Sequence, residues 1–185
     1  MSVIRSVMFV MLVAMLAFTP AASRVELEAA QHTFHDGAKS SSAFIELVRQ
    51  ATEPFRDVAN VPAGYGPTLG CVSGPDQGAM GVHFVNGALV GNDSLDPKQP
   101  EALIYEFKDG TARLVGVEFI VPAELWHQTH DLTDPPVLEG QLLHLVESPN
   151  RFGLPAFYEL HVWAWRDNPN GAFVDWNTRV SCEGQ

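Results

Sequence analysis

The chain has 185 residues, of which 46% are hydrophobic and 18% are charged. This length suits one domain with a substantial buried core, and so apolar a composition argues against a disordered chain. Lys and Arg total 11 against 22 Asp and Glu, which gives a formal net charge of -11. Because nucleic acids and anionic membrane surfaces are bound by basic surfaces, this charge argues against both as partners.

The first 23 residues have the features of a cleaved secretory signal peptide. Arg5 precedes an almost unbroken apolar run at 7–18, and small residues follow at 21–23, as signal peptidase requires. An apolar run of about 12 residues is shorter than the roughly 20 that span a bilayer, which argues against a permanent membrane span. We therefore expect a protein exported to the bacterial periplasm or secreted, with a flexible arm over 24–41 and a single domain over 42–185.

Cys71 and Cys182 are the two cysteines of the chain. Exported proteins fold in an oxidising compartment, where an even number of cysteines indicates a disulfide. By chain entropy, closing a loop of about 110 residues stabilises the fold by about 4–5 kcal/mol. We expect this disulfide; the alternative of two free thiols is disfavoured because neither cysteine lies in a CxxC motif.

The apolar residues of Ser42–Asn60 follow the period of an α-helix. They recur every three or four positions: Phe44, Leu47, Val48, Ala51, Phe55, Val58 and Ala59. We expect Ser42 to cap this helix and Pro54 to kink or restart it, because proline has no backbone donor. The apolar stripe needs a sheet or a second helix to cover it.

Short apolar runs separated by turn residues follow the glycine- and proline-rich segment Pro62–Gly81. They predict strands at Ala79–Val85, Ala102–Phe107, Arg113–Val121, Gln141–Val146 and Ala156–Trp165. Asn86-Gly87 and Asp109-Gly110 favour tight hairpins between strands. We predict one α+β domain, with a curved antiparallel sheet or small β-barrel of five or six strands and one N-terminal amphipathic helix packed on it.

One predicted strand carries an unusual mixture of side chains on a single face. Because successive side chains of a strand alternate between its faces, five residues share one face: Phe157, Glu159, His161, Trp163 and Trp165. A solvent face rarely carries so many aromatic residues, and a core face rarely carries Glu and His. A ligand cavity explains both features, and we expect its ligand to contact four of these residues: Phe157, Glu159, Trp163 and Trp165.

His83 and Glu118 each lie in an otherwise apolar predicted strand. If they point into the same interior as His161, the three form a set of two histidines and one carboxylate. Such a set can bind a divalent transition metal and leave positions open for water or substrate. Glu159 would be a fourth ligand or would orient His161. These three residue types do not indicate which of zinc, copper, iron and manganese is bound.

Glu106 also lies in an apolar strand. A two-residue turn at Asp109-Gly110 places it opposite Arg113, which predicts a cross-strand ion pair. The same register puts Glu106 on the other face of the sheet from Glu118. We therefore exclude Glu106 from the candidate site.

Several blocks of the sequence resemble those of a group of exported bacterial proteins that have no assigned activity. The blocks are Gly64-Tyr65-Gly66 before Cys71, Gly78–Asn86, Ala102–Glu106, Leu114–Phe119, Tyr158–Trp163, and Asp175-Trp176-Asn177 before Cys182. The resemblance covers about Phe55 to Cys182 and implies an exported, single-domain bacterial protein. It implies no substrate or cofactor, and no catalytic residue follows from it.

Together these patterns favour an exported domain that binds a small ligand in an aromatic-lined cavity, with His83, Glu118 and His161 as polar anchors. The anchors would form a metal centre, or the cavity would be a binding site without a metal. The alternative is an acidic structural or protein-interaction protein of the cell envelope, with no small-molecule site. The residue types neither predict nor exclude an enzyme.

Overall fold

The structure is a computed structural model, and it describes residues 41–183. The predicted signal peptide at 1–23, and all but the last residue of the predicted arm at 24–41, lie outside the described residues. Within the described part of the chain, no helix is long and apolar enough to cross a membrane.

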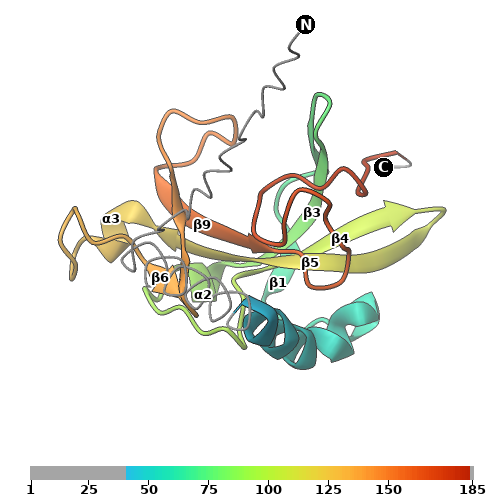
Figure 1. Cartoon of the computed structure of the whole chain (residues 1–185), viewed down its shortest axis with the longest axis horizontal. Coiled ribbons are helices and arrows are strands. Elements are labelled where there is room, and N and C mark those ends of the chain that lie inside the picture. The colour runs from blue at the N-terminus through green and yellow to red at the C-terminus, as the bar shows by residue number, and fades with distance from the viewer. Residues whose placement is uncertain (1–40, 184–185) are drawn as a thin grey trace, which may run out of the picture. The chain divides into compact units, whose positions relative to one another are not determined.

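An antiparallel sheet forms the body of the domain (Figure 1). Its strands lie in the order β1-β3-β4-β5-β9-β8, and β2 also pairs with β3. Their bounds are β1 Tyr65–Pro67, β2 Val72–Gly74, β3 Gly78–Asn86, β4 Ala102–Lys108, β5 Thr111–Pro122, β8 His144–Val146 and β9 Phe157–Val162. The prediction of an α+β fold on an antiparallel sheet is confirmed. Its β-barrel alternative is wrong, because the path of paired strands does not close.

The predicted hairpin at Asp109-Gly110 joins β4 to β5, and both of its residues have positive φ values, as a tight two-residue turn requires. The predicted hairpin at Asn86-Gly87 is wrong. The Asn86 side chain accepts hydrogen bonds from the backbone of Ala88 and Leu89, and so caps the short helix α2 (Gly87–Val90). Asparagine favours both turns and helix caps, so the dipeptide alone does not choose between them.

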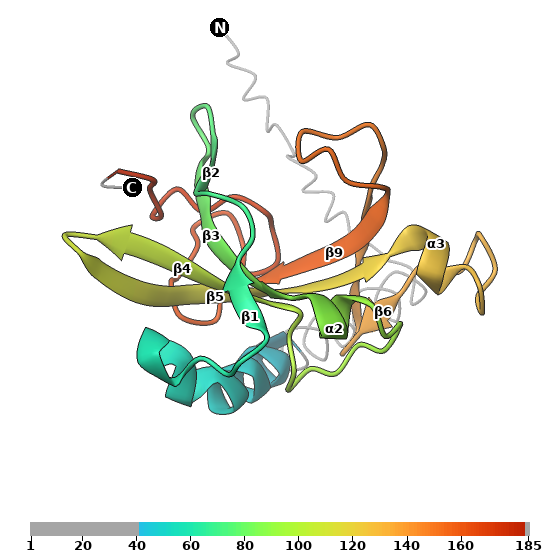
Figure 2. The same cartoon turned by 180° about the vertical axis from the view of Figure 1, so that it is seen from behind.

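The N-terminal helix covers one face of the sheet (Figures 1 and 2). Residues 41–52 are helical, and the chain then tightens into two 3₁₀ turns, η1 (Glu53–Arg56) and η2 (Val58–Asn60). The expected interruption at Pro54 is therefore confirmed. Ser42 is not the cap, because the helix already includes residue 41.

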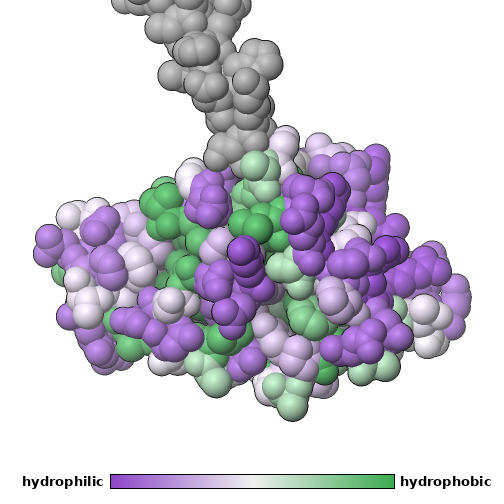
Figure 3. Space-filling view, turned by 90° about the horizontal axis from the view of Figure 1, so that it is seen from below, coloured by the Kyte–Doolittle hydropathy of each residue, from purple (hydrophilic) through white to green (hydrophobic). Residues whose placement is uncertain are grey.

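The remaining elements are short and lie in the connection between β5 and β8. They are α3 (Ala123–Trp126) and the paired strands β6 (Val137–Leu138) and β7 (Gln141–Leu142). The face drawn in Figure 3 is mostly hydrophilic, with smaller hydrophobic areas between the polar residues.

Each face of the sheet has its own core. Under the helix, Phe44 and Val48 pack in a cluster with apolar side chains of β4, β5 and β9. On the other face, the segment after β9 contributes Trp163 and Val180 to a second cluster. The predicted disulfide between Cys71 and Cys182 is present beside this second cluster and ties the C-terminal segment to the chain before β2.

A bulge in β5 changes which of its residues share a face with β4. Ile104 is paired with Gly116, but the next residue, Tyr105, is paired with Leu114, so Val115 is extra. An extra residue reverses the alternation of side chains beyond it. The residues of β5 after the bulge therefore face the side opposite to the one that simple counting from the turn predicts.

This bulge overturns the predicted placement of Glu106. Arg113 is opposite Glu106, as expected, but Glu106 and Glu118 lie on the same face rather than on opposite faces. The ion-pair partner of Glu106 is Arg166, at 2.6 Å, and its carboxylate also accepts a hydrogen bond from the backbone of Ser181. These contacts hold Glu106 to the C-terminal segment and keep it out of the candidate site.

We expect Phe44→Ala to reduce the free energy of unfolding by about 3–5 kcal/mol, because the change leaves a cavity under the helix. Phe44 is 1% exposed and its ring contacts Phe119 and Phe173. Leu132→Ala is the matched control, since Leu132 is 81% exposed and its loss should cost less than about 0.5 kcal/mol. Chemical denaturation measures both, and equal losses would contradict this helix–sheet core.

Candidate metal centre

His83, Glu118 and His161 lie on one face of the sheet although they come from β3, β5 and β9. Glu118 and His161 are direct partners in the β5–β9 ladder. On its other side Glu118 is opposite Ala102 of β4, whose small side chain leaves room above that strand. His83 is opposite Ile104, the next residue of β4 on this face, and so reaches diagonally across Ala102 to Glu118.

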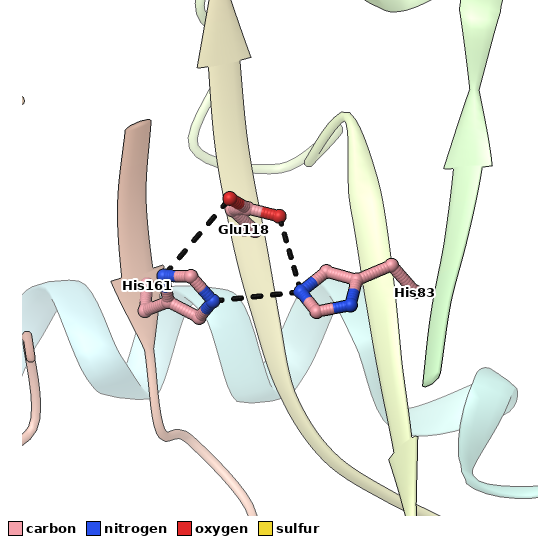
Figure 4. A group of neighbouring side chains, drawn as sticks. All are labelled: His83, Glu118 and His161. Atoms are coloured by element: carbon pink, nitrogen blue, oxygen red, sulfur yellow. Dashed lines mark hydrogen bonds and ion pairs between the residues drawn. The ribbon is translucent and has the colours of Figure 1, made fainter. Parts of the chain in front are cut away.

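The ligand atoms of the three side chains converge, as Figure 4 shows. The Nε2 atoms of His83 and His161 are 3.5 Å apart, and Nε2 of His83 is 3.3 Å from Oε2 of Glu118. Nδ1 of His161 is 4.0 Å from Oε1 of Glu118. Two ligands bound to one ion at about 2.0–2.2 Å are about 2.9–3.6 Å apart in octahedral or tetrahedral geometry. Both distances from His83 fall within that range.

The three side chains are buried, and their hydrogen bonding is incomplete. Nδ1 of His161 is buried without a hydrogen-bond partner among the described residues. Buried polar atoms are normally paired, and an unpaired one costs about 1–3 kcal/mol. A cluster that served only to stabilise the fold would not be expected to carry such an atom.

Burial sets the protonation of this cluster. Burial, and then the neighbouring His161, lowers the pKa of His83 to about 3, and burial also lowers the pKa of His161. Both imidazoles are therefore neutral at neutral pH, the form that binds metals. Burial, and then the charge of Glu159, raises the pKa of Glu118 well above its usual value.

A second group of ionisable side chains adjoins the first. His144 of β8 is opposite Glu159 of β9, with its Nε2 atom 2.9 Å from Oε1 of Glu159 and 3.6 Å from Oδ2 of Asp175. Burial alone would raise the pKa of Glu159, but hydrogen bonds from His144 and Glu118 lower it to about 2. The close imidazole partner of Glu159 is thus His144, whereas the sequence left open whether Glu159 is a fourth ligand or orients His161.

Sequence alternation does not identify His144 or Asp175 as part of the site. His144 lies in the short strand β8, and its pairing with β9 sets its position. Asp175 lies outside the sheet, in the C-terminal segment, where no periodicity indicates a direction. The one sequence signal is its neighbourhood, because Asp175-Trp176-Asn177 is one of the blocks on which the predicted resemblance to exported bacterial proteins rests.

A cavity of about 350 Å³ adjoins the metal-ligand set. Its wall is mostly apolar and includes Met80, Val85, Ile120, Phe152 and Phe157. Among the described residues, the ionisable side chains that line it are His83, Glu118 and Glu159. A volume of this size is within the range of small-molecule sites, which combine an apolar wall with a few polar groups.

Two of the four predicted ligand contacts line this cavity and two do not. Phe157 and Glu159 line it. Trp163 packs in the second core, and the indole of Trp165 donates a hydrogen bond to Thr52 at the end of the N-terminal helix. Trp163 keeps the alternation of the strand, and its ring stacks beside His161 with the centroids 6.0 Å apart, but it packs in the second core rather than along the cavity. β9 ends at Val162, and Trp165 turns to the helix side of the sheet.

A scan of the chain against protein-family models, and searches of curated proteins and of solved structures, found no match. The similarity to exported bacterial proteins therefore stays a prediction. The functional interpretation rests on the geometry and chemistry of the two ligand groups and the cavity.

We expect Glu118→Gln to stabilise the metal-free protein, and increasingly so as the pH rises. The folded-state pKa of Glu118 lies above its unfolded value of 4.5. Its contribution to stability is therefore complete below about pH 4.5 and is lost as the pH rises toward the folded-state pKa, by up to about 1.4 kcal/mol per pH unit. Glutamine cannot ionise and removes this loss.

Melting temperatures in EDTA between pH 4.5 and 8 test this expectation. Glu147→Gln, a change at an exposed carboxylate, is the matched control and should leave the pH profile unchanged. A Glu118→Gln variant that is less stable than the wild type across this range would show instead that the charge of Glu118 supports the fold.

Proposed function

We propose that this protein is an exported small-molecule-binding protein with a divalent transition metal on His83, Glu118 and His161. The observation that carries the proposal is the convergence of three buried ligand atoms from three strands beside an apolar cavity. The unpartnered Nδ1 atom of His161 supports it. With a metal on Nε2, Nδ1 carries a proton that metal-bound histidines commonly donate to a carboxylate, and Glu118 and Asp175 lie beside it. Export is supported by the Cys71–Cys182 disulfide together with the signal-like N-terminus.

The donor set indicates the class of metal. Two neutral imidazoles and one carboxylate suit zinc, iron, copper, manganese and similar ions, whereas calcium and magnesium prefer oxygen ligands. Three protein ligands leave coordination positions for water or a bound molecule. Because His83 and Glu118 line the cavity, a molecule in the cavity would reach those positions.

The cavity indicates the class of ligand. No lysine or arginine lines it among the described residues, so it does not suit phosphates or other highly charged anions. An apolar wall beside a metal suits a mostly apolar molecule with one metal-binding group. A cavity beside Phe157 and Glu159 also supports ligand binding over a purely structural role, for which this face would be packed solid.

Metal titration of the EDTA-treated full chain tests the proposal. We expect saturable binding of Zn²⁺ by calorimetry, and visible absorption bands when Co²⁺ is bound. His161→Ala should weaken the binding by at least about 100-fold, since even the loss of a residue that only orients a ligand costs 10–100-fold. His130→Ala is the matched control, because the His130 ring stacks on Trp126 and His130 belongs to neither ligand group.

The proposal is wrong if the wild type binds no more metal than a His83→Ala/His161→Ala double variant. If apolar ligands then bind the wild type with the same affinity before and after EDTA treatment, the cavity is a binding site that needs no metal. Circular dichroism checks that each variant is folded.

A further inference from the structure

We infer that a second divalent cation binds between His144, Glu159 and Asp175, and that the two ions form one dinuclear centre. The inference rests on the proposed function for the first ion and adds a site that sequence alternation does not indicate. The first ligand set borders the cavity, whereas the second extends from Glu159 toward the solvent.

The distances within the second set suit one ion. Nε2 of His144 is 2.9 Å from Glu159 and 3.6 Å from Asp175, and the three ligand atoms lie within 4.8 Å of one another. Ligands of one ion at about 2.0–2.2 Å are themselves about 2.9–3.6 Å apart. An imidazole with two carboxylates is again a set that transition metals favour.

The two ligand sets are neighbours on the same face of the sheet. Glu118 of the first set is opposite His161 in the β5–β9 ladder, and Glu159 of the second set lies two residues before His161 on the same face of β9. The two carboxyl groups are therefore diagonal neighbours on this face. His161 contacts both sets, with Nε2 facing His83 and Nδ1 lying 3.8 Å from Oδ1 of Asp175. In known two-metal sites the ions are about 3.5–4 Å apart, which requires adjoining ligand sets of this kind.

The charge of the combined cluster exceeds what one ion neutralises. Glu118, Glu159 and Asp175 bring three carboxyl groups together, and no lysine or arginine of the described residues pairs with any of them. As metal ligands all three would be ionised, and one divalent ion leaves one of their three negative charges. Either a proton on His144 or a second ion balances this charge, and carboxylates buried without compensation are costly.

A further observation concerns the Nδ1 atom of His161, which lies where the two ligand sets meet. The side chain of His161 is fully buried, and its Nδ1 atom has no hydrogen-bond partner among the described residues although it faces Asp175 and Glu118. With a metal on Nε2, Nδ1 carries the proton. Metal-bound histidines commonly donate this proton to a carboxylate, and Asp175 is in position to accept it after a shift of less than about 1 Å.

The second set also has a path to solvent. The side chains of His144 and Asp175 are 46% and 30% exposed, whereas the first set is buried beside the cavity. An ion can therefore enter from the solvent side. One face of the dinuclear centre would then meet water and the other the molecule in the cavity.

Metal stoichiometry tests the inference on the full chain. After loading with Mn²⁺ and dialysis, we expect two ions per chain in the wild type, one in His144→Ala and two in the His130→Ala control. Electron paramagnetic resonance gives a second readout. The wild type should show the broadened signal of two coupled Mn²⁺ ions, and His144→Ala the six-line signal of an isolated one.

The outcomes separate the two claims. One ion per chain in the wild type, lost in His161→Ala, overturns the second site and leaves the proposed function standing. No bound ion overturns both. Two ions in both His144→Ala and Asp175→Asn place the second ion elsewhere and overturn the inference. Because His144 is partly exposed, its variant should fold, and circular dichroism checks this.

Discussion

The pairing of Glu118 with His161 in the β5–β9 ladder is the constraint on which the rest of the site depends. Because side chains alternate, a slip of one residue would turn every side chain of β9 to the other face. The observed register places Phe119 and Leu160 in the core under the helix, and it places Glu118 and His161 on the opposite face. The hydrophobic core therefore fixes the geometry of the ligand atoms.

The two faces of the sheet have different roles. The helix side is an apolar core, centred on Phe44 and Val48, and it supplies stability. The other side carries buried carboxyl groups and buried histidines, including the unpaired Nδ1 atom of His161, and these groups reduce stability. Proteins commonly retain such groups where function requires them and stabilise the fold elsewhere. Here the helix–sheet core and the disulfide between Cys71 and Cys182 are the compensating features.

Strand alternation predicted the part of the site that lies on unbroken strands. His83, Glu118 and His161 meet because β3 and β9 alternate regularly around them and β5 does so beyond its bulge. The predictions failed where alternation stops. Val115 forms a bulge and turns Glu118 to the face of Glu106, and β9 ends before Trp165, which packs on the helix side instead of the face of His161. Loop residues such as Asp175 are placed by tertiary contacts, which no periodicity in the sequence encodes.

Zinc K-edge X-ray absorption of the zinc-loaded protein tests the central claim most directly, because it reports the atoms bound to the ion. The account predicts nitrogen and oxygen ligands at about 2.0–2.2 Å, the outer-shell scattering of histidine imidazoles and no sulfur ligand. Loss of the imidazole signal in a His83→Ala/His144→Ala/His161→Ala variant would assign it to these residues. A spectrum with water-type oxygen ligands and no imidazole scattering would contradict the account.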